Sequence, residues 1–106
     1  MQSDQPELQQ KRPLPPQFPR ETARIRKVAS NPDCWFRWRP HAEQRMSEYG
    51  HVADDVIAAL TNGHVIRVDV MEDIVFRVVG KSIDGETIEV AAAVLNDTTI
   101  KVVTVI

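Results

Sequence analysis

Apolar residues recur every three to four positions in the first half of the chain and alternate with polar residues in the second half. The first spacing is typical of helices with one buried face, and the second is typical of strands with one buried face. The change falls close to Gly63, after which Val and Ile become frequent. The pattern predicts an α+β protein in which helices precede strands.

The first predicted helix is short and basic and covers about residues 20–30. Ile25, Val28 and Ala29 recur at helical spacing, and the Asn-Pro pair that follows ends the segment. Residues 33–39 are expected to be extended, because Trp and Phe favour strands and the residue before a proline avoids the α region.

Two more helices are expected before the strands. One runs from Pro40 to Tyr49, because proline fits the first turn of a helix and Gly50 suits a left-handed C-terminal cap. The other runs from about Ala53 to Leu60 and ends at an Asn-Gly pair. The two aspartates in its first turn suit the positive end of the helix dipole.

Four strands are predicted at residues 64–70, 74–80, 86–95 and 99–106, joined by connections short enough for hairpins. The predicted fold is therefore two to three N-terminal helices packed on one face of a four-stranded antiparallel meander. We expect residues 20–106 to form a single α+β domain. Residues 1–19 are rich in Pro and Gln, and we expect them to form a disordered arm.

The register of the meander follows if each turn is the simplest type. Two-residue loops at Asp84-Gly85 and Asn96-Asp97 would place Arg77, Ala92 and Lys101 in one row across three strands. In the first hairpin, a loop at 72–74 would set Asp69 opposite Arg77, and a loop at 71–73 would set Arg67 there. The favourable charge pair favours Asp69.

These registers predict which side chains share each face. Gly80, Glu89 and Thr104 would line up at one end of the core face, and a bulge at Gly80 would swap the two faces. The predicted core face consists of Ile66, Val68, Val70, Ile74, Phe76, Val78, Ala91, Ala93, Ile100 and Val102. The cations would share the other face with Val75, Val79, Val90 and Val103.

Arg77 and Lys101 flanking an alanine would form a shallow slot for a phosphate, since Arg offers a planar fork and Lys a point charge. The alternative is that both are solvent-facing charges that keep a strand soluble.

The stretch WFRWRPHAEQRM, residues 35–46, gathers aromatic and basic side chains. On the second helix His41, Arg45 and Glu48 lie in one stripe, and Ala42, Met46 and Tyr49 lie in the stripe expected to face the core. A boundary imidazole beside a guanidinium suits metal-free RNA cleavage; the alternative is a capping His41 with Arg45 bridging to Glu48. In the preceding segment, Phe36 and Trp38 are expected to be buried and Trp35, Arg37 and Arg39 to point the other way.

Composition and charge limit the partners, cofactors and cellular location to be expected. The 106 residues carry a net charge of −2, yet residues 20–45 hold seven Lys/Arg and only three acids, which suits a phosphate-bearing partner. Cys34 is the one cysteine, and the three histidines lack metal-site spacing, so neither a disulfide nor a metal nor another cofactor is expected. No membrane span or targeting signal is visible, and a cytoplasmic location is expected.

The segment HAEQRMSEYGHVADDVIAALTNGHVI has the spacing H-x3-RM-x3-G-x4-DV-x3-L-x2-G, and it is followed by VVG, a DG turn and a closing VVTVI. With this pattern the chain resembles domain of unknown function family 4258 over roughly residues 36–106. The resemblance implies a barnase/EndoU/colicin/RelE-like fold, similar in particular to MqsR-type toxins, which are mRNA endonucleases silenced by an antitoxin. His41, Arg45 and Thr104 match the family's recurrent polar positions. The toxin's strand-borne Lys, Gln and Tyr are not clearly reproduced, and Arg77 and Lys101 are the nearest substitutes.

Two functions are therefore carried forward. One is a metal-independent endoribonuclease toxin of a type II toxin-antitoxin system, with mRNA and an antitoxin, of zinc-finger MqsA-like type, as partners and room for a homodimer. The other is a non-catalytic module that binds a protein or dimerises. For the enzyme, His41 is the predicted general acid/base, Arg45 a phosphate ligand beside it, and Glu89 and Thr104 position the reacting groups. Phosphate contacts are expected from Arg37, Arg39, Arg77 and Lys101.

Overall fold

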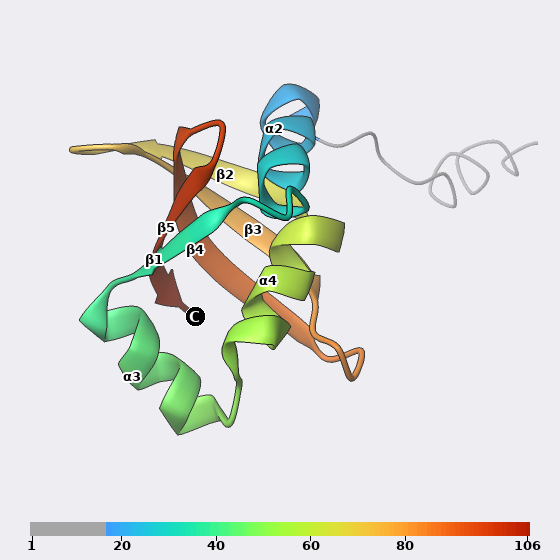
Figure 1. Ribbon diagram of the computed structural model, residues 1–106, viewed down its shortest axis with the longest axis vertical. Helices are drawn as coiled ribbons and strands as arrows, with labels where there is room; N and C mark the ends of the chain where they lie inside the picture. The colour runs from blue at the N-terminus through green and yellow to red at the C-terminus, as the bar shows by residue number, and fades with distance from the viewer. Residues whose placement is uncertain (1–16) are drawn as a thin grey trace, which may run out of the picture.

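The computed structural model describes residues 17–106, and it contains helices and strands in the order that the hydrophobic pattern predicts (Figure 1). The predicted arm falls mainly on residues 1–16, which lie outside the described residues. The helices are α2 (Pro19–Ala29), α3 (Pro40–Tyr49) and α4 (Ala53–Asn62), and the strands are β1 (Trp35–Trp38), β2 (His64–Val70), β3 (Ile74–Lys81), β4 (Thr87–Asn96) and β5 (Thr99–Val105). The α+β class is confirmed, and each predicted helix and strand is present.

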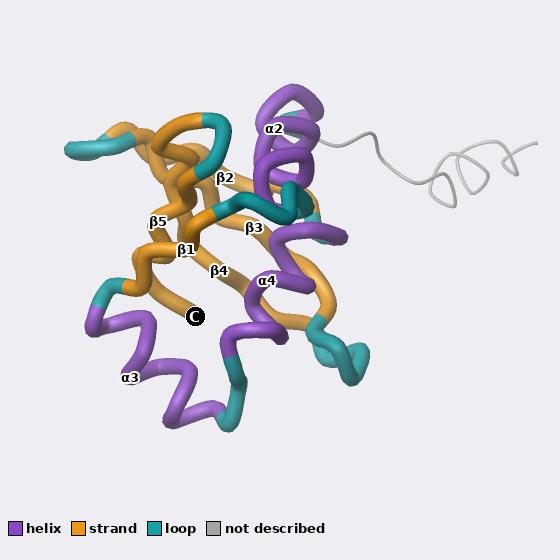
Figure 2. Tube along the Cα trace, in the orientation of Figure 1, coloured by secondary structure: helices purple, strands orange, loops and turns teal. Residues whose placement is uncertain are grey.

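The sheet differs from the predicted four-stranded antiparallel meander. It has five strands in the order β1-β5-β4-β3-β2, and β1 runs parallel to β5 (Figure 2). The Trp35 N–H donates to the Thr98 carbonyl over 2.7 Å, and the Arg39 N–H donates to the Val102 carbonyl over 3.0 Å. The extended segment that the aromatic residues predict therefore becomes an edge strand, because the outer side of β5 offers free backbone groups.

Local signals explain where α3 begins and ends. Pro40 occupies its first turn, where the missing N–H costs nothing, and Gly50 ends it with a left-handed φ of 73°. In α4, Asp55 accepts a hydrogen bond from the Val52 N–H over 3.1 Å and another from the Ile83 N–H over 3.3 Å. One carboxylate thus holds both the start of this helix and the β3–β4 loop.

The helix α4 lies directly against β3. A Cβ on Gly80 would overlap the backbone of Ala59, and a Cβ on Gly63 would approach the Ala59 carbonyl oxygen to 2.5 Å. Glycine is therefore required where helix and strand backbones meet. Gly80 permits this contact and produces no bulge.

The register of the sheet differs from the prediction by one residue at the β3–β4 turn. The Ser82 N–H donates to the Glu86 carbonyl over 2.8 Å, so the loop contains three residues and ends at Gly85, whose φ is 88°. Arg77 therefore lies opposite Ala91 and not Ala92. A slip of one residue exchanges the two faces of a strand.

The other two hairpins also depart from the simplest geometry. In the first, Arg67 lies opposite Arg77, which is the alternative that the charge argument disfavoured. A bulge after Val65 and two irregularities between β4 and β5 adjust the remaining pairs. The predicted row of Arg77, Ala92 and Lys101 is wrong, because Lys101 lies opposite Ala93.

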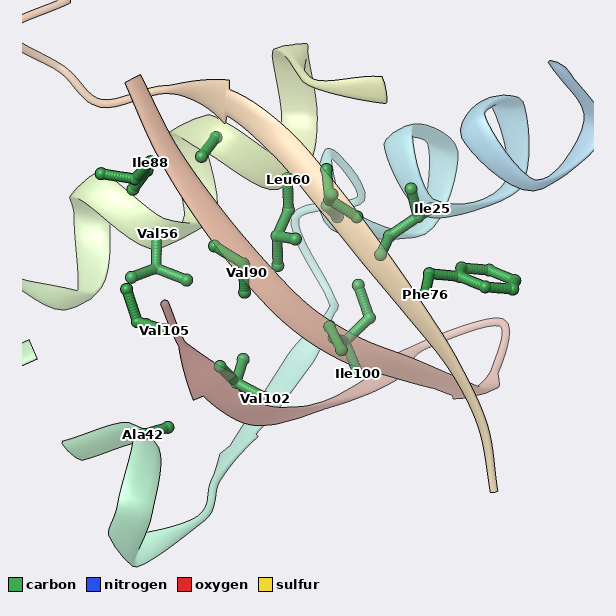
Figure 3. Packing of buried hydrophobic residues seen from close by; sticks show 14 of the residues in the cluster. Ile25, Ala42, Val56, Leu60, Phe76, Ile88, Val90, Ile100, Val102 and Val105 are labelled. Atoms are coloured by element: carbon green, nitrogen blue, oxygen red, sulfur yellow. The ribbon is translucent and has the colours of Figure 1, made fainter. Parts of the chain in front are cut away.

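One hydrophobic core lies between the helices and one face of the sheet (Figure 3). All three helices contribute to it, and the fully buried residues include Ile25, Leu60, Val90, Ile100 and Val102. Phe76, Val78, Ile100 and Val102 are on this face as predicted, and Val68 packs partly buried against it. Ala91, Ala93 and Val90 are on the faces opposite to those predicted. Val70 and Ile74 are exposed at the end of the first hairpin, and Ile66 is exposed at the bulge near the start of β2.

The aromatic segment behaves largely as expected. Phe36 and Trp38 are partly buried against the core with ring centroids 6.1 Å apart, whereas Trp35 is 72% exposed. The segment WFRW is therefore an edge strand that pairs with β5 and leads directly into α3. Tyr49, predicted to face the core, is exposed near the C-terminus of α3.

Candidate functional site

The sheet face turned away from the core, here called the open face, carries three rows of side chains from neighbouring strands. The first row is Arg67, Arg77, Ala91 and Thr104, and the second is His64, Val79 and Glu89. The third contains Lys101 between Arg37 and Ala93. The slipped register thus brings Glu89 and Thr104 to the same face as Arg77.

Two arginines meet directly across β2 and β3. Like charges at opposed positions destabilise a strand pair, so Arg67 and Arg77 need compensation. Each has an acid on the same face: Arg67 Nη2 lies 2.9 Å from Asp69 Oδ2, and Arg77 Nε lies 3.3 Å from Glu89 Oε2. The result is an alternating cluster of two cations and two anions.

The contact between Arg77 and Glu89 is not a well-formed hydrogen bond. Arg77 Nε is buried and has no hydrogen-bond partner among the described residues, although the Glu89 carboxylate is close. A buried donor left unpaired costs about 1–3 kcal/mol. The terminal nitrogens of the guanidinium are the donors that could bind an oxyanion in its plane.

Thr104 and Glu89 complete the polar centre of the open face. Ala91 lies between Thr104 and Arg77 in the first row, so a small side chain leaves space between a hydroxyl and a guanidinium. The Ile106 N–H donates to the Glu89 carbonyl over 2.8 Å, which holds the end of β5 beside Glu89. The predicted positioning pair is therefore adjacent to Arg77, though not at the edge of the core layer as expected.

His64 is the imidazole that shares this face. It lies in register with Val79, which in turn lies opposite Glu89. Two strand spacings separate His64 from Glu89, which is about 10 Å between Cα atoms. An acid/base pair therefore flanks the strand that carries Arg77.

Lys101 and the predicted phosphate ligands of β1 lie at one side of the open face. Lys101 forms an ion pair with Asp73 in the β2–β3 loop, and it lies in register with Arg37. Arg39 and Lys101 line a cavity of about 190 Å³ together with Met71, Glu72, Asp73, Val75 and Val103. Lys101 is thus a partly neutralised cation beside an apolar hollow, and Arg37 and Arg39 are exposed cations next to it.

His41 and Arg45 lie on α3. Arg45 Nη1 donates to the Tyr49 hydroxyl over 2.9 Å, and Glu48 accepts from Gln44, so the expected bridge from Arg45 to Glu48 is absent. His41 is exposed at the start of the helix. Among residues 17–106 no hydrogen bond or ion pair joins either side chain to Arg77, Glu89 or Thr104, so the structure does not bring the two predicted groups of site residues together.

The remaining chemistry of the described residues is sparse. No group of three or more His, Cys, Asp or Glu in residues 17–106 is placed to hold a metal ion. Burial raises the pKa of the Cys34 thiol, and a backbone hydrogen bond opposes this effect. None of the described helices is long and apolar enough to cross a membrane.

Part of the basic segment has structural roles. Arg26 donates to the backbone carbonyls of Asn62 and Gly63, and Arg24 pairs with Asp97 over 2.7 Å. These contacts attach α2 to the end of α4 and to the β4–β5 turn. Fewer of the basic side chains are therefore available to a nucleic acid than their count suggests.

Sequence reasoning missed Arg67 and His64 as members of the candidate site. The signal was present, because a three-residue loop at 71–73 was the open alternative and it places Arg67 beside Arg77. His64 reaches this face only through the bulge between Val65 and Arg67, which a simple hairpin register does not include.

Comparison with models of known protein families assigns the chain to one family. The model of the family described as Domain of unknown function (DUF4258) matches residues 38–106, so the chain belongs to this family. The match begins at Trp38 and includes the three central strands that carry the open face. Searches of curated proteins and of solved structures found no match.

Proposed function

We propose that this protein is a metal-independent endoribonuclease that cleaves RNA on the open face of its sheet. The observation that carries the proposal is the pair of arginines in direct register, with Glu89 and Thr104 beside Arg77. Two forked cations side by side match the oxygens of one phosphodiester, and their mutual repulsion falls when an anion lies between them.

The reaction requires only groups that this face supplies. Glu89 accepts the proton of the ribose 2′-hydroxyl, and the oxygen attacks the adjacent phosphorus. Arg67 and Arg77 hold the phosphate oxygens as negative charge develops on them. The 5′-oxygen leaves and takes a proton from an imidazolium, which gives a 2′,3′-cyclic phosphate and a 5′-hydroxyl.

Two histidines are candidates for the proton donor in that step. His64 shares the open face with Glu89, whereas His41 lies on α3 and matches the recurrent polar position in the family resemblance. The geometry favours His64, because acid and base must lie on opposite sides of the phosphorus atom. Arg45 retains its proposed phosphate role only if His41 acts, since the two are one turn apart on α3.

We further propose that the enzyme is a toxin whose substrate is mRNA and whose activity an antitoxin protein blocks. The support for this assignment is the resemblance of the sequence to MqsR-type toxins. A protein inhibitor would have to cover Arg67, Arg77 and Glu89. An adjacent gene that encodes a zinc-finger protein of MqsA-like type would fit that role.

Incubation of the purified protein with a labelled structured RNA in EDTA tests the proposal. We expect cleavage with cyclic-phosphate ends, and we expect Glu89→Gln and Arg77→Ala to reduce the rate by roughly a hundredfold or more. Arg20→Ala, which removes an exposed arginine from α2, is the matched control and should cleave as the wild type does. Cleavage that survives Glu89→Gln and Arg77→Ala would contradict the site.

The same assay separates the two histidines. Loss of cleavage in His64→Ala with full activity in His41→Ala assigns the proton donor to the open face. The reverse result assigns it to α3 and restores the sequence-based prediction. Growth arrest on expression should follow the same order of variants, and arrest that survives every inactive variant would contradict the toxin assignment.

The second candidate function is a non-catalytic binding module. One observation favours it: Arg67, Arg77 and Lys101 each have a carboxylate within ion-pair distance, so their charges are already compensated. Absence of both RNA cleavage and RNA binding in low salt would establish this alternative over the enzyme.

A further inference from the structure

One of the two edges of the sheet is β2, and the end of the β2–β3 hairpin carries exposed apolar side chains. Strand β2 is last in the sheet order, so one side of it pairs with β3 and the other has no strand neighbour. The exposed side chains are Val70 on β2 at 82%, Met71 in the loop at 71% and Ile74 on β3 at 55%. Exposed edges with apolar side chains pair readily with other strands.

Helix α2 protects only the first half of this edge. The Val65 N–H points away from β3 and donates to the buried Thr22 hydroxyl over 2.9 Å. Beyond Val65 the hairpin extends past α2 toward its tip (Figure 1). Val70 and Ile74 lie opposite each other on the helix side of the sheet, where no described helix covers them.

We infer that two copies of this chain join through antiparallel pairing of β2 with β2 around a twofold axis at Val68. This axis places Arg67 opposite the partner's Asp69 and Asp69 opposite the partner's Arg67. It also brings the exposed Ile66 near the partner's exposed Val70. The strand is therefore self-complementary in charge and in hydrophobicity, as an isologous interface requires.

The same rotation accounts for the bare end of the hairpin. The partner's α2 lies beside its own Val65, close to where the twofold axis brings the end of β2. The partner's α2 therefore comes to the helix side of the sheet, next to the exposed Val70. Each helix would cover the half of β2 that the other leaves bare.

The bulge in β2 limits the regular part of the pairing segment to residues 67–69 of each chain, because Ile66 is the extra residue of the bulge. It lies between Val65 and Arg67, and the chain alternates regularly from Arg67 to Val70. Because the twofold axis is perpendicular to the sheet, both open faces lie on the same side of a continuous ten-stranded sheet. Arg67 belongs both to this contact and to the proposed phosphate site, but sedimentation detects the dimer independently of RNA cleavage.

Sedimentation velocity on the full chain over a concentration series tests the dimer. The wild type should sediment as a dimer at the higher concentrations. Asp69→Arg would oppose two arginines twice in the interface, and we expect the dissociation constant to rise roughly tenfold or more. The double variant Arg67→Asp, Asp69→Arg exchanges the charges and should dimerise again.

A mixture of the single variants Arg67→Asp and Asp69→Arg tests the charge pairing more directly. Chains with Arg67→Asp carry two acids at the edge, and chains with Asp69→Arg carry two bases, so each should be largely monomeric alone and form a heterodimer when mixed. Val70→Lys should also weaken the dimer, because it places a charge beneath the partner's α2. Ile83→Lys, at an exposed position in the β3–β4 turn, is the matched control.

Three results would overturn the inference. A wild type that remains monomeric at every concentration assigns the edge to another partner or to none. A dimer that withstands both Asp69→Arg and Val70→Lys has its contact elsewhere. A charge-exchanged double variant that unfolds with the wild-type midpoint but stays monomeric shows that the Arg67 to Asp69 pairing is not the contact.

Discussion

The two faces of the sheet are built on different principles. On the helix side, fully buried aliphatic residues such as Leu60, Val90 and Ile100 meet without polar groups. On the open face, small buried residues such as Ala91 and Ala93 lie between charged side chains that are only about a third exposed. The first face gains free energy from burial, whereas the second holds charges at fixed positions for little net gain.

The difference indicates where function and stability are separable. Truncation on the helix side leaves a cavity and removes dispersion contacts. Removal of a charge on the open face changes pairwise electrostatics in a partly solvated setting, where the effect on stability is small. Side chains that add little to stability yet are held in register are the ones to test for chemistry.

The largest expected effect is on the helix side. Leu60→Ala should lower the free energy of unfolding by about 2–5 kcal/mol, because Leu60 is fully buried between α4 and the sheet. Urea unfolding followed by circular dichroism measures the change. Val52→Ala, on an exposed residue before the same helix, is the control and should change it by less than about 1 kcal/mol.

A second large effect is expected where α4 touches β3. Gly80→Ala would force a methyl group into the Ala59 backbone, and the helix must move away from the strand. We expect a loss of at least about 2 kcal/mol in the free energy of unfolding. Gly50→Ala is the comparison, because open space surrounds Gly50 and only its left-handed φ is unfavourable for alanine. We expect this variant to lose about 1 kcal/mol in the free energy of unfolding.

The sequence predicts helices and strands well because their signals are local. Pro40 and Gly50 mark the two ends of α3, and the alternation of Val and Ile marks the strands. The pairing of β1 with β5 could not be predicted in this way. It joins segments more than 60 residues apart and depends on a free strand edge that exists only after the sheet has formed.

Register was the part of the candidate site that sequence reasoning could not resolve. Asp84-Gly85 is compatible with loops of two or three residues, and the choice moves Ala91 and Glu89 from one face to the other. The charge rule chose Asp69 as the neighbour of Arg77, yet Asp69 instead pairs with Arg67 along its own strand. The placement of Glu89 and Thr104 on the same face as Arg77 follows only from the observed register.

A moderate effect is expected from the carboxylate that joins two elements. Asp55→Ala removes the hydrogen bonds to the Val52 and Ile83 N–H groups. We expect a loss of about 1–2 kcal/mol in the free energy of unfolding. Asp54→Ala is the matched control in the same helical turn, and an equal loss in both variants would mean that the helix dipole alone explains the effect.

On the open face the expected change in stability is small. Glu89→Gln leaves two opposed arginines with less compensation, and the free energy of unfolding should fall by no more than about 1 kcal/mol. Salt at about 1 M should reduce the difference in stability between wild type and Glu89→Gln, because it screens the repulsion between the two guanidinium groups. A loss as large as that for Leu60→Ala would remove the contrast between the two faces and make Glu89 a structural residue.

The smallest effect concerns an exposed ion pair outside both faces. The hydrogen bond from Arg24, together with its charge, lowers the pKa of the Asp97 carboxyl below its ordinary value. A folded-state pKa below the unfolded one stabilises the fold above the unfolded pKa, and this contribution disappears as the pH falls through the folded pKa. The difference in Tm between wild type and Asp97→Asn should therefore be positive at neutral pH, begin to shrink as the pH falls below about 4, and vanish once the pH is below the folded-state pKa. Asp84→Asn, on an exposed turn, is the control. A Tm difference for Asp97→Asn that persists unchanged in acid would show that Asp97 acts through the shape of the β4–β5 turn and not through its charge.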